Sequence, residues 1–185
     1  MSLDVRRRTY TVDEFDRMGE VGILSEDDRV ELIEGEIVEM AAIGRRHMAV
    51  VNRLNAIFTR RAGDDAIISV QNPIHIDDRF EPQPDIAILR YRSDFYEDSR
   101  PMPVDVLLLV EVADSSLDFD RTTKLPSYAR AGISETWIVN LVDDVIEVYA
   151  DPVGGAYTDT RRIERDGVIR PRRLPDITVP ASDIL

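Results

Sequence analysis

The segment from Val104 to Val112 places the strongest constraint on the fold of this chain. It is apolar except for Asp105 and Glu111. A short run of this kind, rich in valine and leucine, is typical of a strand that is buried on both faces. Such a strand needs neighbouring strands at its sides and other elements above and below it. We therefore expect Val104 to Val112 to be the central strand of a sheet.

The length and composition fit one domain around such a strand. The chain has 185 residues, of which 43% are hydrophobic, enough for one core. We expect a single domain over residues 1–185, with its core at about 10–150 and a tail of short strands and turns at 151–185. No apolar run approaches the roughly 20 residues that span a membrane, and no signal-peptide core follows Arg6-Arg7-Arg8. A cytoplasmic protein is expected.

The N-terminal part carries clear local signals. Thr11, followed three positions later by Glu14, has the pattern of a capping box and predicts a short helix. Two β-rich runs, 29–33 and 36–40, flank Glu34-Gly35, and the glycine suits the positive φ of a two-residue turn. The sequence thus predicts an N-terminal helix and then a β-hairpin.

The remaining elements alternate around the central strand. Pro126 would break a helix if it lay deep inside one, so we expect it in the first turn of a helix that ends near Ala131. Asp118 and Asp120 are then possible caps in a preceding loop, and Lys124 lies at the helix entrance. Together these elements indicate an α/β or α+β fold, a mixed central sheet flanked by helices. The other predicted elements are a helix at 46–62 ended by Gly63, strands at 66–70 with 74 and 76, at 86–89, at 136–142 and at 145–149.

The residue types present limit the chemistry of any site. The chain has no cysteine and two histidines, which excludes disulfides, thiolate nucleophiles and cysteine or histidine-rich zinc sites. A metal would have to be a hard cation bound by oxygen, such as Mg²⁺ or Mn²⁺.

The formal charge of −13 argues against a general electrostatic binder of nucleic acid, because such binding depends on lysine and arginine contacts to phosphate. Arginines do cluster, five within residues 45–61 and six within residues 161–173. They could form a local basic face, or they could simply balance nearby acids at the surface.

Three residues form a candidate catalytic set. Asp85 precedes one predicted strand, Glu111 lies near the end of the central strand, and Lys124, the only lysine among 23 lysines and arginines, follows thirteen residues later. Two carboxylates can hold a divalent cation, and an ammonium beside them can orient water or stabilise charge on a phosphoryl group. Alternatively, Asp85 ends a turn after Pro84, and Lys124 is only a structural ion-pair partner of Glu111.

These residues resemble a known family. The motifs Pro84-Asp85, Glu111-Val112, Asp120-Arg121 with Lys124, Tyr128-Ala129 and Gly132, with the segments 31–38 and 135–139 and with His47, are similar in order and spacing to the Uma-type restriction endonucleases of the PD-(D/E)XK nuclease superfamily. The resemblance covers roughly residues 10–150. It implies the restriction-endonuclease-like fold, Mg²⁺ dependence and cleavage of DNA, and a homodimer as the common arrangement.

The resemblance also assigns roles to residues. Asp85 and Glu111 would be the metal ligands and Lys124 the catalytic lysine. The usual lysine of the superfamily, two residues after the second acid, would fall at Ala113. Lys124 would therefore have to reach the same point from the adjacent helix.

Other polar residues are weaker candidates. Glu31 would be a metal-side or water-orienting acid by its position in the family pattern, although glutamates on hairpin strands are commonly exposed. His47 and Gln71 could join the site, or they could be structural. Trp137 is expected in the core, and Tyr128 is expected to pack its helix on the sheet with its hydroxyl near the site.

Three functions are compatible with the sequence. The first is a Mg²⁺-dependent nuclease that hydrolyses DNA phosphodiester bonds. The second is a non-catalytic protein of the same fold with an assembly or regulatory role, which the acidic charge favours. The third is a Mg²⁺-dependent hydrolase of nucleotides or other small phosphates, which needs no long basic groove.

Overall fold

The expected central strand is present as β5, Val106–Ala113, in a computed structural model that describes residues 7–25 and 27–185. Its eight residues are all buried. β5 starts two residues later than predicted because Pro103–Asp105 forms a 3₁₀ turn, in which Asp105 caps the turn and Val104 is 71% exposed.

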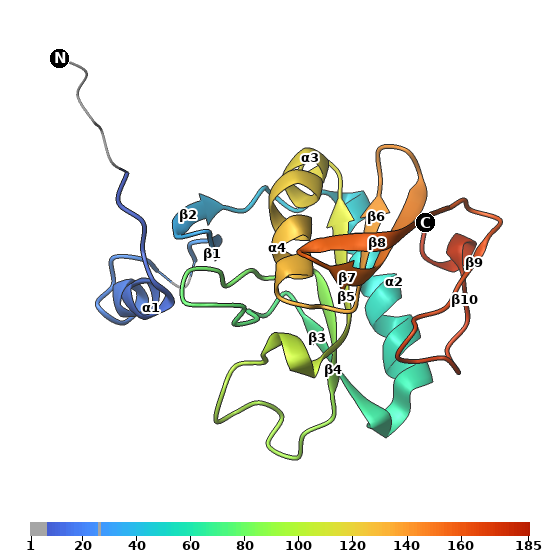
Figure 1. Cartoon of the computed structure of the whole chain (residues 1–185), viewed down its shortest axis with the longest axis horizontal. Helices are drawn as coiled ribbons and strands as arrows, with labels where there is room; N and C mark the ends of the chain where they lie inside the picture. Colours follow the sequence, from blue (N-terminus) through green and yellow to red (C-terminus); the bar gives the residue numbers. More distant parts are fainter. Residues whose placement is uncertain (1–6, 26) are drawn as a thin grey trace.

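β5 lies inside a six-stranded sheet with the order β3-β4-β5-β6-β7-β8 (Figure 1). Neighbouring strands are antiparallel except for β5 and β6, which are parallel. A parallel pair requires a crossover connection, which is here a helical segment packed on one face of the sheet. The other strands are β3 Ala66–Val70, β4 Ile86–Arg90, β6 Glu135–Asn140, β7 Val145–Val153 and β8 Ala156–Ile163.

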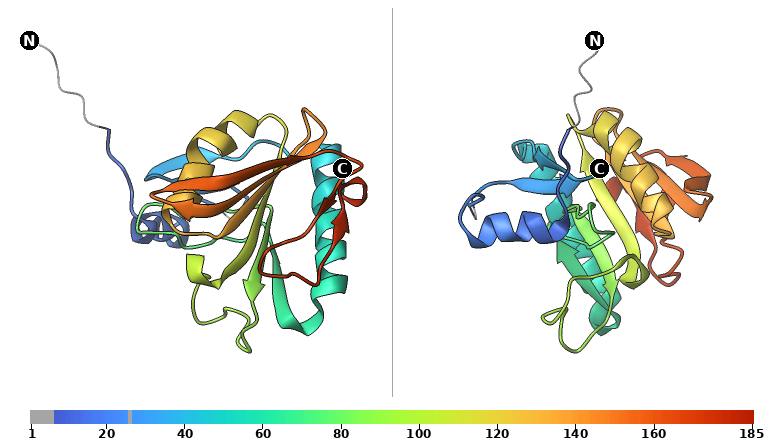
Figure 2. Two further views of the ribbon diagram at one scale, coloured as in Figure 1. Left: turned by 45° about the vertical axis from the view of Figure 1, so that its right-hand side comes forward. Right: turned by 60° about the vertical axis from the view of Figure 1, so that its left-hand side comes forward.

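The N-terminal predictions are confirmed. Helix α1, Val12–Glu20, begins after Thr11, whose side chain and that of Glu14 form the expected capping box. The hairpin consists of β1, Val30–Ile33, and β2, Glu36–Glu39. The turn residues Glu34 and Gly35 have φ values of 51° and 79°. The glycine at the second position adopts its positive φ without strain. Figure 2 shows α1 and the hairpin at one side of the main sheet.

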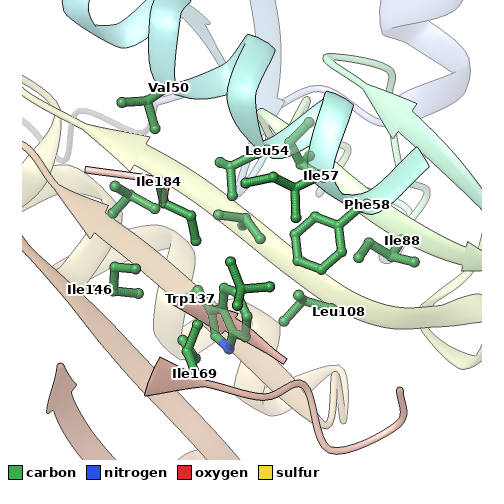
Figure 3. Close-up of a cluster of buried hydrophobic side chains, with 14 of the residues drawn as sticks. Val50, Leu54, Ile57, Phe58, Ile88, Leu108, Trp137, Ile146, Ile169 and Ile184 are labelled. Carbon is green, nitrogen blue, oxygen red and sulfur yellow. The ribbon is translucent and has the colours of Figure 1, made fainter. Parts of the chain in front are cut away.

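Helix α2, Arg45–Ala62, covers one face of the sheet. Its apolar side packs on Trp137, Ile88 and Leu108, which face it from three neighbouring strands (Figure 3). Gly63 has a φ of 56° at the end of the helix, as its position in the sequence suggested. Neither α2 nor any other helix within 7–25 and 27–185 has the length and apolar character needed to cross a bilayer.

The crossover between β5 and β6 differs from the prediction. A continuous helical segment runs from α3, Leu117–Phe119, through a π-helical turn, Asp120–Lys124, into α4, Leu125–Arg130. The aspartates at 118 and 120 therefore lie inside the helix and do not cap it. Lys124 lies in its middle and not at its entrance.

Pro126 is also deeper in this helix than expected. A proline in a regular helix removes a hydrogen bond and its ring meets the carbonyl group four residues earlier. The wider π-helical turn immediately before Pro126 changes this spacing, so the proline continues the segment without ending it.

The tail contributes more than the predicted short strands and turns. β7 and β8 form a long hairpin at the edge of the main sheet, and only β9, Val168–Ile169, and β10, Val179–Pro180, are short. Ile169, Ile177 and Ile184 join the core beside α2. The strand predicted at 74 and 76 is irregular, although Ile74 is buried.

The packing of the tail makes a prediction about stability. Ile184→Ala should lower the free energy of unfolding by about 2–4 kcal/mol, because Ile184 is fully buried and its removal leaves a cavity. Val168→Ala, at a site that is 58% exposed, is the control and should change it by less than about 0.5 kcal/mol. Urea unfolding followed by circular dichroism measures both, and equal midpoints would contradict the assigned packing.

Candidate active site

The register of the sheet brings Asp85 and Glu111 together. β4 and β5 are antiparallel with Ile86 opposite Val110, so the next pair along the two strands is Asp85 and Glu111. Directly opposed residues point to the same face of a sheet. Both acids are buried, at 8% and 4% exposure. The pairing of two strands thus positions two carboxyl groups side by side.

Asp85 is held by donors from three elements. Its Oδ2 accepts the backbone N–H of Val112 at 2.9 Å and contacts Nε2 of His47 at 3.0 Å. Its Oδ1 accepts the side-chain amide of Gln71 at 3.0 Å. The hydrogen bond to Asp85 raises the pKa of His47. Two residues of the candidate set, His47 and Gln71, therefore orient a carboxylate.

Glu111 faces the helical crossover. The hydroxyl of Tyr128 donates to its Oε1 at 2.6 Å, and Nζ of Lys124 lies 3.5 Å from the same oxygen. Burial raises the pKa of Glu111 to about 8, opposed by Lys124 and assisted by the nearby acids. As expected, Tyr128 packs its helix on the sheet and brings its hydroxyl to this site.

Lys124 reaches the carboxylates from the π-helical turn. Its Nζ lies 2.9 Å from Oε1 of Glu31 and 3.5 Å from Oε1 of Glu111, and its side chain is only 7% exposed. Burial alone would lower the pKa of Lys124, but Glu111, Glu31 and Asp120 together raise it. The ammonium group therefore stays charged, beside the strand that carries Ala113.

Glu31 is buried, in contrast to the exposure that is common for glutamates on hairpin strands. It lies on β1, is 4% exposed and accepts the backbone N–H of Gln83 at 3.1 Å through Oε2. Its other oxygen pairs with Lys124. The hairpin thus closes one side of the site and brings a second carboxylate, beside that of Glu111, to the lysine.

Asp120 is a site residue that the sequence interpretation placed in a loop. It is 4% exposed, accepts the Ser116 hydroxyl at 2.7 Å and precedes Lys124 by four residues. Burial raises the pKa of Asp120, and Lys124 opposes this rise. The spacing of Asp120 and Lys124 would have signalled a shared helix face if the helix had been expected to start at Leu117.

All six sequence candidates line one cavity of about 310 Å³. Asp120, Asp114 and Glu39 add further carboxylates to its walls, and Arg29 is the second cation besides Lys124. The cavity is therefore strongly acidic. A polyanion such as a nucleic acid strand could enter it only if cations first reduced this charge. The six candidates are Glu31, His47, Gln71, Asp85, Glu111 and Lys124.

The donors at the cavity fit a hard divalent cation. Asp85 and Glu111 offer carboxylate oxygens, and Asp85 is oriented by hydrogen bonds of the kind that surround metal ligands. Mg²⁺ usually keeps several waters and binds through one or two carboxylates. Within the two described ranges, no group of three or more His, Cys, Asp or Glu side chains is arranged to hold a metal ion. Asp85 and Glu111 are therefore the two protein ligands that this site could offer to such an ion.

Most arginines of the two clusters are engaged by acids or carbonyl groups. Arg46 and Arg165 pair with Asp144, and Arg172 pairs with Asp151. Arg53 donates to backbone oxygens of the C-terminal residues. The interpretation of these arginines as balancing charges at the surface is therefore favoured over a continuous basic face.

Comparisons with known proteins show the family and the fold of the chain. A family model described as "Uma2: Putative restriction endonuclease" matches residues 12–182. The chain belongs to this family. The match extends through the tail, beyond the roughly 10–150 that the motif resemblance covered. Membership of the Uma2 family supports a nuclease role.

A solved structure shows the same fold. The crystal structure of a putative nuclease belonging to DUF820 from Anabaena variabilis ATCC 29413 has a TM-score of 0.73 and 17% identity, over 94% of this chain and 96% of that chain. The predicted fold class, a mixed central sheet flanked by helices, is therefore confirmed, and the same fold is present in that putative nuclease structure. No significant match was found among curated proteins.

The burial of Lys124 makes a prediction about stability. Lys124→Met should lower the free energy of unfolding by about 3–5 kcal/mol, because it leaves buried carboxylates without their cation. Chemical denaturation measures the change. Arg130→Met, on the same helix, removes the ion pair between Arg130 and Glu34, and both of these side chains are 56% exposed. This variant should lower the free energy of unfolding by less than about 1 kcal/mol. Similar losses in both variants would contradict this account.

Proposed function

We propose that this member of the Uma2 family is a Mg²⁺-dependent endonuclease that hydrolyses phosphodiester bonds in DNA. The observation that carries the proposal is the convergence of Asp85, Glu111 and Lys124 on one cavity. The family match and the nuclease-like fold support the reaction class.

The proposed reaction assigns metal binding and ligand orientation to different residues. Asp85 and Glu111 would hold the cation. The bound cation would offset the negative charge of the scissile phosphate and lower the pKa of an attacking water. His47, Gln71 and the backbone N–H of Val112 keep the Asp85 carboxylate in one orientation. Tyr128 does the same for Glu111.

Lys124 would stabilise the negative charge that develops on the phosphoryl oxygens. Its ammonium group is already fixed by Glu31, which lowers the reorganisation needed during the reaction. A lysine suits this position because its compact ammonium group can donate hydrogen bonds in several directions within a confined space. Glu31 and Asp120 are then positioning residues that keep Lys124 charged.

The acidity of the cavity bears on how DNA could approach. α2 begins at the cavity with Gly44 and His47, and its eighteen residues include five arginines and no acid. Arg45 and Arg60 are exposed, and neither has an ion pair within the described residues. These two side chains are the ones we expect to contact the phosphate backbone outside the cavity. The homodimer implied by the family resemblance also remains a prediction.

A second candidate is a non-catalytic protein of this fold. The specific observation in its favour is the direct pairing of Lys124 with Glu31 and Glu111, because a closed ion-pair network needs no substrate. A hydrolase of small phosphates is an intermediate possibility, since the cavity is of a size that admits a mononucleotide.

Cleavage assays distinguish these functions. The wild type should nick plasmid DNA with Mg²⁺ and lose this activity with a chelator. Asp85→Asn, Glu111→Gln and Lys124→Met should each lower the rate by roughly 100-fold or more. Asp98→Asn, at an exposed acid that does not line the cavity, is the control and should keep full activity. Hydrolysis of nucleotides but not of DNA would favour the small-phosphate enzyme.

Metal binding is a separate prediction that does not depend on turnover. Calorimetric titration with Mn²⁺ should show binding to the wild type and to Asp98→Asn. Asp85→Ala and Glu111→Ala should weaken the binding by at least about tenfold, since each removes a charged ligand. Unchanged binding in both Ala variants would exclude these acids as ligands, and no binding by the wild type would favour the non-catalytic protein.

A further inference from the structure

A second ion pair anchors the π-helical turn that carries Lys124. Nε of Arg121 donates to Oε2 of Glu147 at 3.0 Å, and a terminal nitrogen of Arg121 donates to Oε1 of the same carboxylate. This two-point geometry fixes the plane of the guanidinium group as well as its distance. Arg121 lies three residues before Lys124 in the same turn.

The two pairs lie on one row of the sheet. Glu111 on β5 is in register with Ile138 on β6, and Ile138 is in register with Glu147 on β7. Residues in register point to the same face, so the two carboxylates lie on the helix-covered face two strands apart, roughly 10 Å. The turn crosses this row with Arg121 at one carboxylate and Lys124 at the other.

Glu147 is a rigid partner. It is 6% exposed and also accepts the side-chain amide of Asn140 at 2.8 Å and the hydroxyl of Tyr149 at 2.7 Å. Asn140 in turn accepts the backbone N–H groups of the turn between β6 and β7. The carboxylate of Glu147 is thereby held in place by residues of the sheet, independently of its pair with Arg121.

The helix lacks one backbone hydrogen-bond donor beside this turn. A π-helical turn is rare, and Pro126, two residues after Lys124, contributes no backbone N–H. Rotation of this turn about its axis would move Lys124 away from Glu111 and Glu31. Side-chain anchors on both sides of the turn restrict such a rotation.

We propose that Arg121 is a positioning residue of the active site, and that its pair with Glu147 sets the rotation of the π-helical turn and so the place of the Lys124 ammonium group. The effect of this pair on catalysis rests on the proposed nuclease function, whereas its effect on the position of Lys124 does not. A direct contact of Arg121 with the DNA backbone is the competing role, because its side chain is still 34% exposed.

The single lysine of the chain permits a direct test of position. Selective ¹³Cε labelling of lysine gives one side-chain signal, that of Lys124. Arg121→Met and Glu147→Gln each remove one partner of the Arg121–Glu147 pair. Both variants should shift this signal, and both should speed up reductive methylation of Lys124 by at least about tenfold. Arg130→Met removes an exposed arginine of the same helix and should leave both readouts unchanged. Circular dichroism shows whether each variant is folded.

The kinetic test uses the same variants. Arg121→Met and Glu147→Gln should lower kcat for DNA cleavage by roughly 10–100-fold with little change in KM, as expected for a displaced catalytic group. A raised KM with unchanged kcat would assign Arg121 to DNA binding and overturn the proposal. An unmoved Lys124 signal in folded Arg121→Met and Glu147→Gln would also overturn it. Absence of cleavage by the wild type would instead count against the nuclease function, because the lysine signal reports position without turnover.

Discussion

The buried ammonium group of Lys124 is the interaction on which the site depends. It pairs with Glu31 from the hairpin and with Glu111 from the central strand, while its own helix connects β5 to β6. The distant hairpin, the central strand and the helix that follows this strand therefore meet at one charge. Isolated carboxylates at this depth would be very costly, and the lysine compensates them together with two hydrogen bonds. The Tyr128 hydroxyl donates to the Glu111 oxygen that faces Lys124, and the N–H of Gln83 donates to the other oxygen of Glu31.

The architecture around this charge follows from the parallel pairing of β5 and β6. Parallel neighbours need a crossover, and the crossover helix lies on the sheet face that carries Glu111 and Glu147. α2 and the tail occupy the opposite face with an apolar core around Trp137 (Figure 3). Both faces of the sheet therefore bury apolar side chains, and the helix-covered face also carries the buried charges around Lys124.

Charge also explains how an acidic chain could act on DNA. Most of its arginines are used in pairs with neighbouring acids, so a long basic groove is not formed by the described residues. The local charge at the cavity then matters more than the total of −13. In the proposed function the compensation comes from a divalent cation at Asp85 and Glu111, from Lys124, and from Arg45 and Arg60 of α2.

The sequence by itself determined the features that depend on local pattern. The buried central strand, the capping box at Thr11, the turn at Glu34-Gly35 and the helix before Gly63 all follow from periodicity and turn chemistry, and all are present. The pairing of Asp85 with Glu111 was also within reach, because two short strands joined as neighbours leave few registers that bury both apolar runs.

Only the tertiary structure decided the features that depend on distant contacts. The start of the crossover helix at Leu117 and its π-helical turn place Asp120 inside the site and Lys124 in the middle of the helix, whereas Pro126 alone suggested a helix entrance. The burial of Glu31, the anchoring of Arg121 by Glu147 and the packing of Ile184 beside α2 likewise join segments far apart in the chain. The stability of these contacts depends on the joint removal of charged and apolar groups from water. A local sequence pattern does not predict it, because the partners lie far apart in the chain.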